Sequence, residues 1–238
     1  MKLHRFFVDL KLEPYLNQKN GAIEIQDKEL AHQIKKVLRY EIGDSIIIFD
    51  GAFHEATAQI EKINNEGVEI KIISIEKNKA EPEKQITLYL SILKRENFEL
   101  AVQKAVEVGI SEIVPIICGR TIKTGLNGER IKKIIKEAAE QSGRGKIPAL
   151  NESLSFEDAV KKAAASGALI LFDISGTPFD SNEFKNEKNI SIFIGPEGGW
   201  APLELSLAAQ AGVHIVKMSD LTMRAETAAI VASYLTAK

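Results

Sequence analysis

From residue 84 onward the chain alternates between strand-like and helix-like segments, and this alternation limits its fold more than any other feature. Compact runs of β-branched residues predict strands, and apolar residues at helical spacing predict helices. The predicted strands are 86–93, 112–117, 168–172, 190–194 and 214–218, and the predicted helices are 97–108, 127–141, 156–165, 203–211 and 225–237. Such alternation predicts an α/β fold with a mainly parallel sheet covered on both faces. Ligands of such sheets bind beyond the carboxyl ends of the strands.

Residues 1–76 follow a different pattern. Alternating runs predict strands at 4–8, 44–49, 55–63 and 67–75. One helix is predicted from an N-cap at Asp27 through Arg39. Short strands with a single helix indicate a small β-barrel. The polar segment 76–84 is typical of a linker, so the sequence predicts two domains, 1–76 and 84–238.

Cysteine and histidine content bears on disulfides and metals. With Cys118 as the single cysteine, no intramolecular disulfide can form, and a reducing cytoplasm is the expected location. We expect Cys118 to pack as a small apolar residue. One thiol and four histidines argue against a dedicated metal site. No apolar run approaches the length that spans a bilayer, so neither a metal nor a membrane partner is predicted.

Charge gives a mixed indication about nucleic acid. The 31 basic and 33 acidic residues give a net charge of −2, which argues mildly against RNA. Residues 120–146 nevertheless contain eight basic residues against three acidic ones. This stretch is either a solvated helix face or a phosphate-binding surface, and composition alone favours the former.

A glycine-rich turn, Ile194 to Trp200, follows one predicted strand and precedes a helix opened by Pro202. Glycines let backbone amides approach a ligand closely, and a helix N-terminus favours bound anions. The turn lacks the fingerprints of phosphate-binding and dinucleotide-binding loops, which argues against a nucleotide-binding oxidoreductase. The alternative interpretation is a turn that binds no ligand.

A second segment, 221–228, is polar and leads into the apolar last helix. Thr222 is the expected N-cap, and Glu226 in the first turns is favoured by the helix dipole. Capping alone therefore explains these two residues. It does not explain Arg224, because a cation near a helix N-terminus is unfavourable unless an anion compensates it. Arg224 thus indicates a ligand contact.

Together, these two segments resemble the signature pair of the RsmE-type methyltransferases, members of the SPOUT superfamily that methylate N3 of a uridine in small-subunit ribosomal RNA. Further similarity to the family lies at 5–8, 32–39, 104–110, Pro115, Arg120 and 137–144. The family usually reads Leu-Gly-x-Arg-Ile-Leu-Arg in the second segment. Here Met218-Ser219-Asp220-Leu221-Thr222-Met223-Arg224 lacks the glycine and the first arginine.

The resemblance implies a PUA-like β-barrel, followed by a methyltransferase domain with a trefoil knot in its parallel sheet. It also implies S-adenosylmethionine as the cofactor and a homodimer in which each site borrows from its partner. The cofactor-binding residues that it implies are Leu171, Phe172, Ile194, Gly195, Pro196, Glu197, Gly198, Gly199, Met218, Leu221, Met223, Arg224 and Thr227.

Methyl transfer to uridine N3 also requires removal of the N3 proton. Glu226 is the candidate base, and Arg224 is placed to stabilise charge on the pyrimidine oxygens, with capping and ion pairing as alternatives for Glu226. The candidate contacts to ribosomal RNA, free or in the assembled small subunit, are Arg5, His32, Arg39, Arg95, Arg120 and Arg144. Each arginine is alternatively a solubilising surface residue, and His32 is alternatively structural. A non-catalytic RNA-binding protein and a methyltransferase for another RNA remain alternatives.

Overall fold

The computed structural model describes residues 3–16, 21–122 and 124–238, and the chain divides into two compact units. Unit 1 comprises Met1–Glu81 and Ala139–Ile147. Unit 2 comprises Pro82–Ala138 and Pro148–Lys238. The sequence interpretation placed all residues after 84 in the second domain, whereas the structure packs a short later segment with unit 1.

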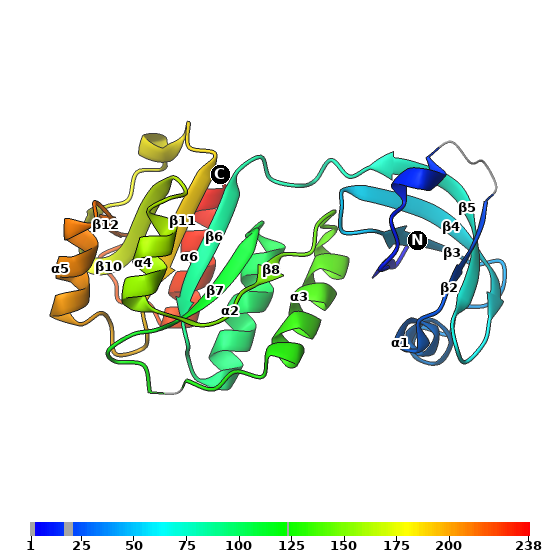
Figure 1. Ribbon diagram of the computed structural model, residues 1–238, viewed down its shortest axis with the longest axis horizontal. Coiled ribbons are helices and arrows are strands. Elements are labelled where there is room, and N and C mark those ends of the chain that lie inside the picture. The colour runs from blue at the N-terminus through cyan, green and yellow to red at the C-terminus, as the bar shows by residue number, and fades with distance from the viewer. Residues whose placement is uncertain (1–2, 17–20, 123) are drawn as a thin grey trace. The chain divides into compact units, whose positions relative to one another are not determined.

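Unit 1 contains one five-stranded sheet in the order β1-β3-β4-β5-β2 (Figure 1). Its strands are β1 (Arg5–Phe7), β2 (Ala22–Ile25), β3 (Ser45–Phe49), β4 (His54–Ile63) and β5 (Val68–Lys77). The β1 and β3 strands are parallel, and the other neighbours are antiparallel. The prediction missed β2, which is only four residues long and buries only Ile23 and Ile25.

The single helix of unit 1 begins where the sequence predicts. Asp27 caps α1 (Lys28–His32), because its Oδ1 accepts a hydrogen bond from the Leu30 N–H at 3.0 Å. The helix continues as a π-helical turn, Gln33–Val37, and ends before the predicted Arg39. Arg39 itself adopts a left-handed conformation with φ of 57°, which a continuing helix does not allow.

Unit 2 contains a seven-stranded sheet in the order β12-β10-β11-β6-β7-β8, with β9 also pairing with β7. Its strands are β6 (Gln85–Ser91), β7 (Glu112–Ile117), β8 (Ala149–Leu150), β9 (Leu154–Ser155), β10 (Ala168–Pro178), β11 (Asn189–Ile194) and β12 (His214–Lys217). Every neighbouring pair is parallel. The predicted parallel α/β sheet is therefore confirmed.

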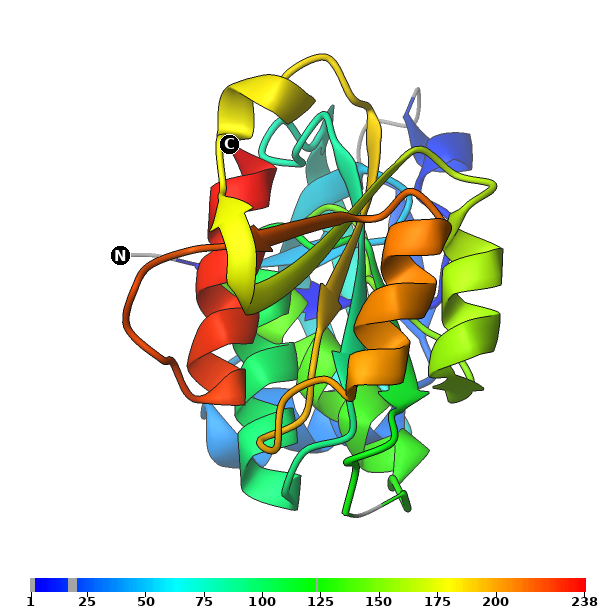
Figure 2. The same ribbon diagram turned by 90° about the vertical axis from the view of Figure 1, so that its left-hand side faces the viewer.

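Helices cover both faces of this sheet (Figure 2). The helices are α2 (Arg95–Glu107), α3 (Gly128–Ser142), α4 (Phe156–Ala163), α5 (Pro202–Gln210) and α6 (Ala225–Ala237). On one face α2 packs against α6, and on the other α4 packs against α5. Parallel strands buried on both faces have long apolar runs, which is why these strands were readable from sequence.

The core beneath α4 and α5 is aromatic and reaches the carboxyl edge of the sheet. Tyr89 stacks on Phe193 with ring centroids 4.5 Å apart, and Phe156 lies 5.0 Å from Trp200. Cys118 lies in the same core, where burial raises the pKa of its thiol to about 12. Cys118 therefore packs as an apolar residue, as predicted. A thiol with so high a pKa stays protonated and unreactive.

Within the described residues, no helix combines the length and the apolar character needed to cross a membrane.

Candidate functional site

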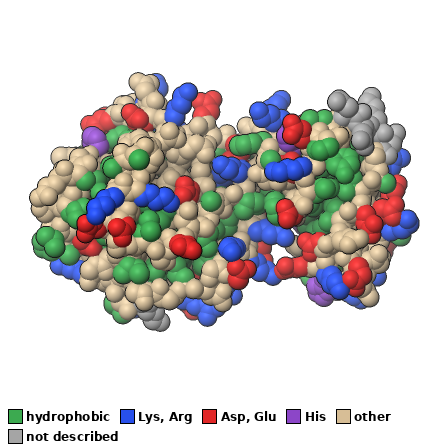
Figure 3. All heavy atoms as spheres, in the orientation of Figure 1, with side chains coloured by type: hydrophobic (Ala, Val, Ile, Leu, Met, Phe, Trp, Pro, Cys, Tyr) green, Lys and Arg blue, Asp and Glu red, His purple; other side chains and the backbone are tan. Residues whose placement is uncertain are grey.

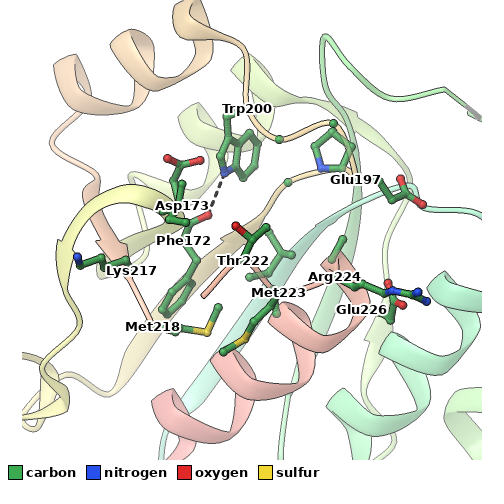
Figure 4. A pocket seen from close by; sticks show the side chains of 18 of the residues that line it. Phe172, Asp173, Glu197, Trp200, Lys217, Met218, Thr222, Met223, Arg224 and Glu226 are labelled. Atoms are coloured by element: carbon green, nitrogen blue, oxygen red, sulfur yellow. Dashed lines mark hydrogen bonds between the residues drawn. The ribbon is translucent and has the colours of Figure 1, made fainter. Parts of the chain in front are cut away.

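A pocket of about 770 Å³ lies in unit 2 at the carboxyl ends of β11 and β12 and beside the middle of β10 (Figure 4). Three segments form most of it: 172–174, where the pairing of β10 with β11 ends, and 194–200 and 217–226, which begin with the last residues of β11 and β12. The start of α2 completes the lining with Lys94 and Asn97. Its position agrees with the rule that ligands of parallel sheets bind at this edge, and its size is typical of a cofactor site.

The glycine-rich turn owes its shape to backbone bonds and to Trp200. The Gly199 N–H donates to the Pro196 carbonyl at 2.8 Å, and Gly199 has φ of 68°, which favours glycine. A Cβ on Gly195 would lie 2.9 Å from Cε2 of the Trp200 ring. The indole Nε1–H in turn donates to the Phe172 carbonyl at 3.0 Å, which joins the ends of β10 and β11. The sequence analysis included Trp200 in the candidate turn but did not predict it as an individual cofactor contact.

The turn between β12 and α6 is held by its own side chains. Lys217 Nζ pairs with Asp220 at 2.6 Å, and the Leu221 N–H donates to Ser219 Oγ at 2.9 Å. Ser219 stands where the family pattern has its glycine, and Asp220 occupies the variable position that follows it. They therefore order the turn locally in this chain.

The predicted N-cap at Thr222 is wrong. The helix α6 begins at Ala225 with Arg224 as its N-cap, because the first helical hydrogen bond runs from Ala228 N–H to Arg224 O at 2.8 Å. Thr222 is exposed and lines the pocket. Helix capping therefore does not explain the threonine at position 222.

Arg224 and Glu226 differ in their environment although they are two residues apart. Arg224 is exposed at the N-cap, whereas Glu226 in the first turn is only 7% exposed. Among the described residues, Oε2 of Glu226 is buried without a hydrogen-bond partner. A buried polar atom left unsatisfied costs about 1–3 kcal/mol, so this oxygen is suited to a donor from a ligand. In Figure 4 both side chains lie on the α2 side of the pocket, away from Asp173 and Lys217.

Most residues predicted to bind the cofactor come together in this pocket, but two do not line it. Leu171 is 1% exposed, and its side chain packs in the core beneath α4 and α5. Thr227 is exposed on α6 and lies outside the lining. The lining residues that the cofactor prediction did not include are Lys94, Asn97, Asp173, Ile174, Trp200, Lys217, Ser219, Thr222, Ala225, Glu226 and Ala228. Several of them directly follow strand ends, which is the signal that would have identified them.

The predicted RNA contacts Arg5 and Arg144 are committed to contacts inside unit 1. Arg144 is 4% exposed, and its Nε and Nη2 donate to the Glu81 carboxylate at 2.9 and 3.0 Å. Arg5 pairs with Glu55, donates to the Arg144 carbonyl at 3.1 Å and lies over the Phe49 ring. These contacts give both arginines a structural role.

The remaining candidates are more accessible. His32 and Arg39 are exposed on and just after the helix of unit 1. Arg120 is exposed in unit 2, and its Nη1 donates to the Gly198 carbonyl at 2.8 Å beside the glycine-rich turn. Arg95 is also exposed and pairs with Glu99 at 3.0 Å.

The basic stretch 120–146 is partly neutralised by ion pairs. Lys132 pairs with Glu129, and Arg130 binds both oxygens of Glu99. Hydrogen bonds from Arg130 hold the pKa of Glu99 at about 2. On the face drawn in Figure 3, basic side chains are interspersed with acidic ones. Lys123 of this stretch lies outside the described residues.

Among the described residues, no group of three or more His, Cys, Asp or Glu side chains is placed to hold a metal ion.

Two family models match the chain. The model for an RNA methyltransferase domain matches residues 80–237, and the model for an RNA methyltransferase PUA domain matches residues 25–73. The first match alone spans more than half of the chain and includes every residue of the pocket. The second confirms the predicted PUA-like character of the N-terminal part.

Relatives and solved structures agree with these matches. Ribosomal RNA small subunit methyltransferase E of Rickettsia conorii is 29% identical over 98% of this chain and 94% of the relative. The protein of the same name from Buchnera aphidicola is 30% identical over 92% of this chain and 91% of the relative.

Two structures solved with S-adenosylmethionine superpose with a TM-score of 0.88 at 25% identity. They are a putative methyltransferase of Legionella pneumophila, covering 99% of this chain and 97% of that one, and ribosomal RNA small subunit methyltransferase E of Neisseria gonorrhoeae, covering 98% and 95%. These findings confirm the predicted resemblance. The chain belongs to the RNA methyltransferase family that includes the ribosomal RNA small subunit methyltransferase E proteins.

Proposed function

We propose that this chain methylates N3 of one uridine in small-subunit ribosomal RNA, with S-adenosylmethionine as the methyl donor. Family membership supports the reaction class and the cofactor. The single observation that carries the proposal is a buried Glu226 oxygen, without a hydrogen-bond partner in the described part of the chain, in a pocket walled by the glycine-rich turn.

The residues of the pocket fit S-adenosylmethionine. The glycine-rich turn offers a backbone surface without side chains, and Phe172, Met218 and Met223 offer apolar contacts for the purine and the thioether chain. Asp173 and Glu197 are acceptors for hydroxyl and ammonium groups. Bound there, S-adenosylmethionine supplies an electrophilic methyl group on a sulfonium. Leu171 and Thr227 flank this site in sequence and belong to the same proposal, although neither lines the pocket.

Glu226 and Arg224 are the proposed catalytic residues. The Glu226 carboxylate accepts the N3 proton of the uridine through the oxygen that has no partner among the described residues. The Arg224 guanidinium donates to the pyrimidine oxygens, on which negative charge develops when the proton leaves. The backbone turns of the pocket position the uridine for attack on the methyl group, which reduces the entropy cost of the reaction.

Two finer features of the fold belong to the same proposal. We propose a trefoil knot, supported by the return of the chain from β12 at the sheet edge to α6, which packs against β11 and β6. We also propose a homodimer with completed sites at its interface, as the family resemblance implies. Light scattering of the purified protein measures the mass directly.

The proposed substrate is ribosomal RNA, free or in the small subunit, which places the enzyme in the cytoplasm. Arg39, Arg95, Arg120 and His32 are the proposed RNA contacts because their side chains are exposed. Arg144 is 4% exposed and pairs with Glu81, and Arg5 pairs with Glu55, so a phosphate contact by either of them has to replace an ion pair.

The test is methylation of small subunits, and of naked 16S ribosomal RNA, from a strain that lacks the modification. The expected product is one 3-methyluridine per RNA, detected by mass spectrometry after nuclease digestion. Binding of the RNA without methylation would support the non-catalytic alternative, and methylation of another RNA alone would also contradict the proposal.

A further inference from the structure

The start of α2 forms a wall of the pocket that the proposed chemistry leaves unused. Lys94 is the N-cap of this helix, and Asn97 lies in its first turn. Both side chains line the pocket together with Arg224 and Glu226.

This wall is firmly positioned. The Lys94 N–H donates to Oε1 of Glu197 at 3.1 Å, which ties the helix start to the glycine-rich turn. Leu93 is 2% exposed and Phe98 is fully buried, so apolar packing anchors the helix on both sides of Lys94 and Asn97. In addition, α2 packs along α6, the helix that carries Glu226.

The chemistry of this wall suits an external ligand. Neither the Lys94 ammonium nor the Asn97 amide has a side-chain partner among the described residues, whereas the intervening Arg95 pairs with Glu99. A cation at a helix N-terminus opposes the helix dipole unless an anion neutralises it. Asn97 is half-buried, and an amide in such a position gains from a hydrogen-bond partner.

The position of Glu226 indicates which ligand the start of α2 contacts. In the proposed function the uracil ring that accepts the methyl group must contact Glu226, and Glu226 and Arg224 lie on the α2 side of the pocket (Figure 4). The turns at 172–174 and 217–223 lie across from them and serve the cofactor. The uracil ring and the phosphate of the target nucleotide therefore face α2.

We propose that Lys94 and Asn97 form the subsite for the target nucleotide, an inference that rests on the proposed function. The Asn97 amide donates to O4 of the uracil, and the Lys94 ammonium pairs with a phosphate flanking it. Cytosine carries an amino group at the position of O4, so it cannot accept this hydrogen bond, and Asn97 binds it only after turning its amide oxygen toward the base.

The test compares two variants with matched controls on the same unit. Lys94→Met and Asn97→Ala are compared with Lys185→Met and Asn186→Ala, which alter exposed residues outside the pocket. The measurements are kcat and KM for small subunits at several salt concentrations, Kd for S-adenosylmethionine by calorimetry, and the thermal midpoint.

We expect Lys94→Met to raise KM for RNA about fivefold and to reduce the slope of log KM against log salt by about 1. We expect Asn97→Ala to lower kcat/KM on the order of tenfold. For both, Kd for S-adenosylmethionine should stay within about twofold of wild type, since the cofactor contacts remain.

Kinetics equal to those of the two controls would overturn the inference, and so would a rise in Kd for S-adenosylmethionine that matches the rise in KM. Either result leaves the proposed function intact as long as the wild type methylates RNA. A wild-type protein that neither binds S-adenosylmethionine nor methylates RNA contradicts the proposed function itself.

Discussion

Two clusters of opposite charge, one in each unit, differ in how completely the protein satisfies them. In unit 1, Arg144 and Glu81 are both nearly buried and hydrogen-bonded to each other. In unit 2, Arg224 is exposed and Glu226 keeps a buried oxygen with no partner among the described residues. Arg144 and Arg224 were both predicted to contact a ligand, but the Arg144 guanidinium is already bound to Glu81. Next to it, Arg5 Nε is the buried atom of unit 1 that has no hydrogen-bond partner among the described residues.

This difference shows that the role of a charged residue in a family motif depends on which hydrogen-bond partners the folded protein provides for it. A buried pair with complete hydrogen bonds stabilises local structure, and removing one partner exposes the other to an unfavourable environment. An unsatisfied buried carboxylate lowers stability and is retained where a ligand uses it. Mutations in the two clusters should therefore separate stability from activity.

The largest expected effect is on activity, from Glu226→Gln. Loss of the proposed base should lower kcat by about 10²–10⁴-fold. The free energy of unfolding should change by less than about 1 kcal/mol, because loss of the favourable helix-dipole interaction and removal of a buried charge have opposite effects. Turnover assays and denaturant unfolding measure the two quantities, and full turnover by the variant would refute the base assignment.

Arg144→Met should have the opposite profile. Leaving the Glu81 carboxylate in its buried position without the guanidinium should lower the free energy of unfolding by about 3–5 kcal/mol. Lys132→Met, which removes an exposed pair, should cost less than about 1 kcal/mol. If Arg144→Met instead keeps wild-type stability and raises KM for RNA, Arg144 contacts RNA and the contrast between the clusters fails.

Gly195→Ala tests whether packing sets the shape of the pocket. The added Cβ meets the Trp200 ring, which Phe156 and the Phe172 carbonyl hold in place. We expect a loss of about 1–3 kcal/mol in stability and weaker binding of S-adenosylmethionine. Gly125→Ala is the control, since nothing lies within 4 Å of a Cβ there. Equal thermal midpoints and cofactor affinities for the two variants would contradict this.

The smallest effect concerns Glu99, which pairs with arginines at the surface. Hydrogen bonds from Arg130 lower its pKa from 4.5 to about 2, so its contribution is complete above pH 4.5 and is lost as the pH falls toward 2. Glu99→Gln should lower stability by no more than about 1 kcal/mol at pH 7. The difference from wild type should shrink between pH 4.5 and 2 in denaturant unfolding. A difference that stays constant over this range would contradict the assignment.

The parallel sheet could be predicted because its strands are apolar on both faces and its helices have regular spacing. The strand β2 could not, since four residues with two buried side chains give almost no pattern. Residues 139–147 are joined to the rest of unit 1 by pairings between residues far apart in sequence, such as Arg144 with Glu81 and Phe7 with Glu140. Periodicity is a local signal and carries no information on such pairings.

The site was predictable where glycines or strand ends mark it. The turn at 194–200 lines the pocket as expected. Thr222 was assigned to a cap because its residue type favours that position, but the turn formed by Ser219 and Asp220 delays the helix to Ala225. Lys94 was missed although it directly follows the predicted strand 86–93, and Asn97 was missed because it lies inside a predicted helix.

A crystal structure of the protein grown with S-adenosylmethionine tests the central claim most directly. Our account predicts the donor between the 194–200 turn and the 217–223 turn, with its methyl group facing Glu226 and the start of α2. A donor bound elsewhere, with these turns facing solvent, would contradict the account.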